Sequence, residues 1–136
     1  MRQQSGQALV EWAASAFVVM LFGLSILAVG QVVGEYMAVR AAATQAAFAA
    51  ARAPSDQDAQ AAGTQAAQEA IRGTQVQQFK VTIYTGGFQR GGVLTATATG
   101  CVSLDAFPIA SQYLGRCPPL RWQSHALVEP YRSRTP

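Results

Sequence analysis

The sequence predicts an α+β fold, in which a long amino-terminal helix and a shorter second helix accompany a small antiparallel sheet of three strands. Residues 12–34 carry no charge and lead into an alanine-rich segment that contains no proline before Pro54. After Gln77 the apolar residues recur at every second position, which is the period of a half-buried strand. With 136 residues, the chain has room for one small domain.

Composition argues against several classes of protein. Only 12% of the residues are charged, against an average of about 25% in soluble domains. The net charge is +3, but apart from Arg2 the basic residues are scattered singly between Arg40 and Arg134, so they form no patch for nucleic acid. We therefore expect no nucleic-acid partner.

The uncharged run is long enough to cross a membrane, because a helix of about 20 residues spans a hydrocarbon core of about 30 Å. The sequence predicts a transmembrane segment at about residues 12–34, within a helix over residues 7–53. A buried helix of a soluble protein is disfavoured, since the rest of the chain is too small to cover it on all sides. A secretory signal peptide cut after Gly30, where small residues lie two apart, is an alternative.

Glu11 is an unusual residue at the start of such a segment. A lone carboxylate at membrane depth costs several kcal/mol unless it is compensated. If the chain were cut after Gly6, the new α-amino group of Gln7 would lie one helical turn from Glu11, which becomes the fifth residue of the shortened chain. The two charges then neutralise each other, or Glu11 neutralises the amine of a neighbouring subunit.

These residues resemble those of a known family. The leader over residues 1–6, the following glutamate and the apolar helix are similar to a prepilin-type signal, which a prepilin peptidase cuts on the cytoplasmic side, here between Gly6 and Gln7. Residues 6–13, GQALVEWA, resemble the GxxxVEfA start of the TadE-like minor pilins, or pseudopilins, of the tight-adherence (Flp, type IVb) pilus system. Residues 39–53 are similar to the alanine-rich AAreaAR segment of that family. Many members carry a proline in the membrane helix that is missing here, so no kink is assumed.

The resemblance implies a pilin-like fold and a non-enzymatic role in pilus assembly, surface attachment and biofilm formation. It implies a single-pass protein of the bacterial inner membrane, with residues 54–136 in the periplasm and incorporation into an extracellular pilus as a further expectation. The implied partners are other minor pilins (TadE/TadF-like), the major Flp pilin, the prepilin peptidase and the inner-membrane assembly platform. Two alternatives are a membrane-tethered periplasmic binding or scaffold domain outside any filament, and a secreted domain released at Gly30.

Two patterns along the long helix predict packing. Its outer half is amphipathic, and we expect an apolar stripe to carry the soluble domain, with or without a role in assembly, while Glu35, Gln45 and Arg52 point elsewhere. The stripe consists of Val33, Met37, Ala41, Phe48 and Ala51. Gly30, Gly34 and Ala38 are small residues spaced by four, which allow a partner helix to approach closely, although such a pair of glycines also occurs without a dimer. The same two glycines weaken the helix and are a candidate hinge.

The remaining residues predict one helix and three strands. A helix at about residues 55–72 begins with Ser55 as N-cap and with Asp56 and Asp58 in its first turn. It ends near Gly73 as C-cap, and its alanine face is Ala59, Ala62, Ala66 and Ala70. The strands are expected at about residues 77–85, 93–104 and 120–129. Their inward residues are Phe79, Val81 and Ile83; Leu94, Ala96, Ala98, Val102 and Leu104; and Leu120, Trp122, Ala126 and Val128.

Cys101 and Cys117 predict a disulfide, which stabilises an exported domain by about 3 kcal/mol for a loop of about 15 residues. Two free thiols in the cytoplasm are the alternative. The distribution of arginines does not decide the orientation, but the leader resemblance and the cysteines both favour an exported domain. The loop 105–114, with Phe107, Ile109 and Tyr113, is a candidate contact surface. Alternatively, those side chains fill a local satellite core.

The sequence gives little support to an enzyme. His125 is the single histidine and lies on the polar face of an expected strand, without metal ligands near it in the sequence. Asp56 and Asp58 are better explained by helix capping. The glycine pairs at 86–87 and 91–92 bracket a turn and lack the strand and helix of a phosphate-binding loop. We expect no catalytic residues, no metal site and no cofactor.

Overall fold

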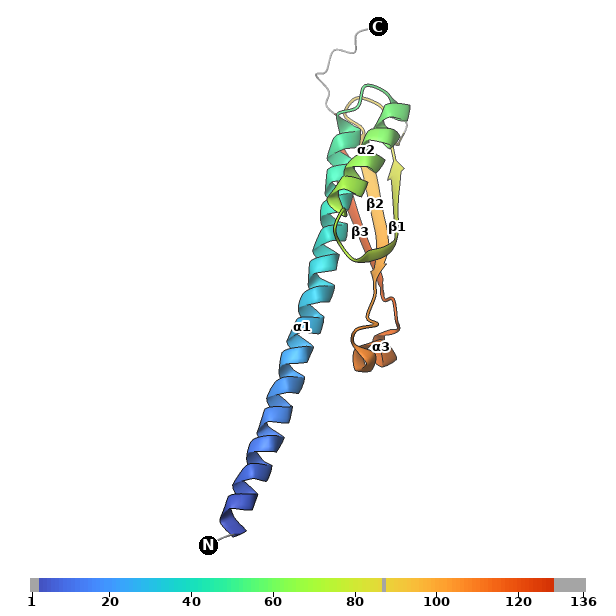
Figure 1. The fold of residues 1–136 in the computed structure, drawn as a ribbon. Coiled ribbons are helices and arrows are strands. Elements are labelled where there is room, and N and C mark those ends of the chain that lie inside the picture. The colour runs from blue at the N-terminus through green and yellow to red at the C-terminus, as the bar shows by residue number, and fades with distance from the viewer. Residues whose placement is uncertain (1–2, 87, 129–136) are drawn as a thin grey trace. The chain divides into compact units, whose positions relative to one another are not determined.

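The computed structural model describes residues 3–86 and 88–128, with side chains from Gly6 onward. Its elements are α1 (Gln3–Ala51), α2 (Asp56–Ala70), β1 (Val76–Tyr84), β2 (Val93–Val102), α3 (Pro108–Leu114) and β3 (Pro119–Leu127) (Figure 1). The α+β class with a long amino-terminal helix is confirmed. The chain divides into two compact units, Met1–Val32 and Val33–Pro136. The start of the leader (1–2), Gly87 of the expected turn and residue 129 of the expected third strand lie outside the described residues.

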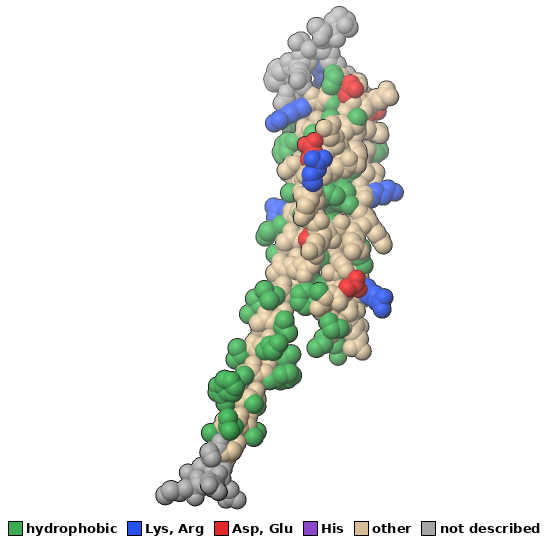
Figure 2. All heavy atoms as spheres, in the orientation of Figure 1, with side chains coloured by type: hydrophobic (Ala, Val, Ile, Leu, Met, Phe, Trp, Pro, Cys, Tyr) green, Lys and Arg blue, Asp and Glu red, His purple; other side chains and the backbone are tan. Residues whose placement is uncertain are grey.

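The first unit is the amino-terminal part of α1, and its apolar side chains face solvent. Trp12 is 72% exposed and Phe22 67%, and Figure 2 shows hydrophobic side chains all along this part of the helix. The helix is long and apolar enough to cross a membrane, so a candidate membrane span is present where the sequence predicts one. The hydroxyls of Ser15 and Ser25 donate to the carbonyls of Glu11 and Leu21, each at 2.8 Å, so neither needs a partner outside the helix.

The second unit contains an antiparallel sheet with the order β1-β2-β3. Val76 pairs with Val102, and Cys101 pairs with Pro119, so these residues mark one end of the sheet. The predicted alternation is confirmed, because the expected inward residues of all three strands are buried or half-buried. The strands end earlier than predicted, at Val102 and Leu127. A bulge between Gln77 and Lys80 interrupts the β1–β2 register.

The face of α1 that packs in the second unit differs from the predicted stripe. Val33, Met37 and Phe48 are 44%, 62% and 53% exposed, and Ala41 is exposed as well. Ala51 alone of the expected stripe is buried. The buried residues of α1 are Val39, Ala42, Ala43, Ala46, Ala47, Ala50 and Ala51. The prediction followed the largest apolar side chains, whereas the helix packs through alanines, which permit a closer approach of its backbone.

The start of α2 agrees with the sequence and its end does not. The hydroxyl of Ser55 accepts the N–H of Asp58 at 3.2 Å, and Asp56 and Asp58 lie in the first turn. The C-cap is Ile71 rather than Gly73, which lies two residues further on with a φ of 85°. Of the predicted alanine face, Ala59 is buried and Ala62, Ala66 and Ala70 are half-buried; the fully buried positions are Ala59, Gly63 and Ala67.

Gly63 is the point at which α2 comes closest to its neighbours. A methyl group placed there would overlap Cδ1 of Ile83 and would lie 2.9 Å from the carbonyl oxygen of Ala46 and 3.2 Å from Cβ of Ala50. Two of these atoms belong to α1 and one to β1, and the Ala46 oxygen is backbone that cannot rotate away. Only glycine therefore fits between α2, α1 and the sheet.

We expect Gly63→Ala to destabilise the second unit by about 1–3 kcal/mol, because overpacking here exceeds the gain in helix propensity. For a domain of this size, that is a fall in Tm of about 5–15 °C. Thermal unfolding of the detergent-solubilised full chain measures the change. Gly34→Ala is the matched control, since a methyl group there meets no atom within 4 Å. Equal Tm values for the two variants would contradict the close packing at Gly63.

Candidate functional site: the start of α1 and the disulfide-closed loop

Glu11 lies one helical turn after Gln7 on the exposed surface of α1. The Nε2 group of Gln7 donates to Oε1 of Glu11 at 3.3 Å. The expected cleavage junction between Gly6 and Gln7 is helical, because α1 begins at Gln3 rather than at the predicted residue 7. The uncut chain thus offers Glu11 a neutral amide partner. An α-amino group on Gln7 would place a cation within the same turn.

The expected helix-packing residues leave an open surface. A methyl group on Gly30 or Gly34 would meet no atom within 4 Å, and α1 continues through both glycines without a break. Ala38 is half-buried. Within the part of the chain that the structure describes, nothing packs on the two glycines, so they remain available to a partner helix.

Trp122 of β3 makes two contacts with the second unit's part of α1. The ring of Tyr36 meets it edge-on, with centroids 5.7 Å apart. The guanidinium carbon of Arg40 lies 4.9 Å from the centre of the Trp122 ring, which is cation–π geometry. The inward direction of Trp122 is as predicted, but its partners were not identified. Tyr36 and Arg40 are spaced by four residues and so share one face of the helix. This spacing, together with an aromatic residue on a strand, is the sequence signal by which their contact with Trp122 could have been predicted.

Glu35 is turned toward the sheet, so the expectation that it points away from the domain is wrong. Its Oε1 accepts the N–H of Gln75 at 3.0 Å, and its Oε2 is buried without a hydrogen-bond partner among the described residues. Gln75 immediately precedes β1. The contact therefore attaches the first turn of the second unit to the end of the sheet marked by Val76.

We expect Glu35→Ala to lower the free energy of unfolding by about 1–2 kcal/mol, because the N–H of Gln75 loses its acceptor. Glu35→Gln should keep that acceptor and remove the buried charged oxygen, so its stability should equal or exceed that of the wild type. Chemical denaturation of the solubilised full chain measures both. A Glu35→Gln variant as unstable as Glu35→Ala would show that the charge itself is needed.

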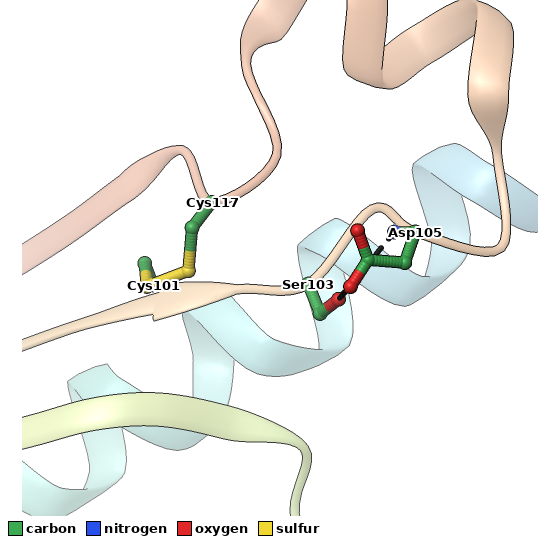
Figure 3. Close-up of a disulfide and its surroundings, with 4 residues drawn as sticks. All are labelled: Cys101, Ser103, Asp105 and Cys117. Carbon is green, nitrogen blue, oxygen red and sulfur yellow. Dashed lines mark hydrogen bonds between the residues drawn. A yellow bond between two sulfur atoms is a disulfide. The ribbon is translucent and has the colours of Figure 1, made fainter.

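Cys101 and Cys117 form the predicted disulfide, with Cα atoms 5.2 Å apart. It joins the end of β2 to the segment that precedes β3 (Figure 3). Beside it, the Ser103 hydroxyl donates to Oδ2 of Asp105 at 2.7 Å, and the N–H of Leu104 donates to the carbonyl of Arg116 at 3.0 Å. The loop is therefore closed at its base by one covalent bond and one backbone hydrogen bond.

The segment predicted to be a loop contains a helix, α3. Pro108 occupies its start, where a proline is favourable because no N–H is required there, and the N–H of Ser111 donates to the carbonyl of Phe107 at 2.9 Å. Ile109 and Tyr113 are 67% and 84% exposed. These two side chains do not fill a satellite core, so that alternative is wrong for them, whereas Phe107 is half-buried.

Removing the disulfide should lower the free energy of unfolding by about 3 kcal/mol. The double variant Cys101→Ser/Cys117→Ser, unfolded as the full chain in detergent, provides the measurement. The wild type under strong reducing conditions is its control and should match it. A double variant as stable as the oxidised wild type would mean that the hydrogen bond between Leu104 and Arg116 is enough to close the loop.

The described residues contain no group of three His, Cys, Asp or Glu side chains placed to hold a metal ion. His125 is exposed on the polar face of β3, as expected, and its Nδ1 lies 2.9 Å from Oγ1 of Thr95. In comparisons with protein-family models, with curated proteins and with solved structures, no match to this chain is found.

Proposed function

We propose that this protein is a minor pilin or pseudopilin of the TadE-like kind, which a prepilin peptidase processes between Gly6 and Gln7 and which acts in assembling a tight-adherence type IVb pilus. In this proposal residues 12–34 hold the subunit in the inner membrane. Residues 54–136 lie in the periplasm, and the subunit is taken into the fibre or its tip. Surface attachment is the outcome.

The observation that carries the proposal is the position of Glu11. It is a carboxylate at the start of an uncharged run, exposed on α1, and among the described residues its side chain accepts from the neutral amide of Gln7. Cleavage after Gly6 supplies the missing cation at the residue that already contacts Glu11. An ordinary membrane anchor has no use for an acid at this place, whereas a subunit that pairs it with an amine in cis or across a helix contact does.

Three further features support the proposal. The open surface at Gly30 and Gly34 suits close contact with helices of neighbouring minor pilins or of the major pilin. The second unit combines a helix and a small sheet, the layout that the resemblance implies. The disulfide between Cys101 and Cys117 fits a domain exported to an oxidising compartment.

The mature amino terminus tests the proposal. Intact mass of the protein extracted from the membranes of the cell that makes it should give a chain that begins at Gln7. A chain that begins at Met1 would favour the membrane tether, and one that begins at Gln31 would favour the secreted domain. A Gln7 start with loss of ammonia would reveal a cyclised and uncharged terminus, which would contradict the charge pairing.

Glu11→Gln then tests the role of the charge in the same cells. It should insert and be cleaved normally but fail to support piliation, because the freed amine has no counter-ion. The matched control is Glu69→Gln, since Glu69 accepts from Gln65 four residues earlier at 3.0 Å, in the same arrangement on α2. Normal piliation in the Glu11→Gln strain would contradict the mechanism.

A further inference from the structure

The helix α3 turns its apolar face outward. Ile109 and Tyr113 lie one turn apart on the same side of this helix and are 67% and 84% exposed, and Leu114, its last residue, is 62% exposed. Ser111 lies on the side opposite Ile109 and Tyr113 and is half-buried, and its hydroxyl donates to the carbonyl of Pro108 at 3.0 Å. No residue of α3 is buried. A short surface helix normally places its apolar side against the core. Because the apolar side chains of α3 point outward, they would be more stable in contact with an apolar environment outside the domain.

The position of α3 within the second unit indicates what that environment is. The end of β2 and the start of β3, between which α3 is inserted, lie at the end of the sheet marked by Val76. Glu35 contacts Gln75 at that same end, and the chain enters the unit there, directly after the uncharged residues 12–34. Figure 1 shows α3 beyond this end of the sheet. The first turn of α1 within the second unit and α3 therefore lie at the same end of the sheet.

Two exposed residues at this end are of types that proteins place at a membrane surface. They are Tyr113 of α3 and Arg116, which follows α3, whereas Trp122 with its partners Tyr36 and Arg40 pairs with Ala98 near the middle of the sheet. Tyrosine is enriched at the level of lipid headgroups, and an arginine near it pairs with anionic phosphates. Figure 2 shows hydrophobic side chains gathered at this end of the second unit.

We propose that α3 rests on the surface of the membrane that residues 12–34 cross, with Ile109, Tyr113 and Leu114 inserted at the level of the lipid headgroups. The inference rests on the membrane span of the proposed function. A helix this short binds a bilayer too weakly by itself, but the covalent link to the span keeps it at high effective concentration beside the lipid. The disulfide and the bond between Leu104 and Arg116 hold the base of the loop in place.

Depth-dependent quenching tests this contact in the full chain. An environment-sensitive fluorescent amino acid replaces Tyr113, and the protein is reconstituted in vesicles of phosphatidylcholine and phosphatidylglycerol. Some lipids carry a nitroxide on the headgroup or deep in the acyl chain. The matched control carries the probe at Arg90, an exposed residue of the connection between β1 and β2 at the opposite end of the sheet. A third variant carries it at Leu24, inside the span.

We expect headgroup nitroxides to quench the probe at residue 113 about threefold or more beyond residue 90, as an interfacial helix requires. Ile109→Asp combined with Leu114→Asp should reduce that quenching to the level of residue 90. Equal quenching at 113 and 90, together with deep quenching at 24, would overturn this inference and leave the proposed function intact. Absence of deep quenching at 24 would overturn the span itself.

Discussion

The close approach of α1 to its neighbours is the constraint on which the second unit depends. Its buried face consists of Val39 and a series of alanines, and Gly63 of α2 lies against the backbone of that face. Alanine buries little area, so stability must come from short distances and from the larger residues of the sheet, such as Leu94 and Val102, which are fully buried. A single added methyl group at the contact therefore matters more than in a core of large side chains.

Glu11 and Glu35 flank the uncharged segment. A carboxylate near apolar surroundings needs a hydrogen-bond donor or a cation, and the two residues differ in the partner that they have. Glu35 accepts the N–H of Gln75, and its second oxygen is buried without a hydrogen-bond partner among the described residues. In the described part of the chain, the side chain of Glu11 accepts from the amide of Gln7, which is a weaker partner than a cation. Glu35 thus has a hydrogen-bond donor within the fold for one of its two oxygens, whereas Glu11 would gain a charged partner from the amine that cleavage creates. This difference is why Glu11, rather than Glu35, carries the proposed function.

The strands were predictable because polar and apolar residues alternate in each, and that alternation survives in the fold. The packed face of α1 could not be predicted in the same way. Met37 and Phe48 are more hydrophobic than alanine, so a hydrophobicity pattern assigns them to the buried face. The helix at Pro108 was missed because seven residues give too little periodicity to recognise. In the candidate site, the disulfide and the polar position of His125 were predictable from the sequence. The contacts of Glu35 and Trp122 were not, since they join residues far apart in the chain.

The irregularity in β1 has a consequence for how the subunit meets other chains. β1 is an edge strand, and Gln78 adopts a φ of 51° between the two paired stretches. An incoming strand needs a continuous row of N–H and C=O groups, and a bulge breaks that row while twisting the edge away. The β1 edge of the sheet is therefore protected against pairing with the edge strand of another copy of this chain. Such pairing leads to aggregation when many copies lie close together.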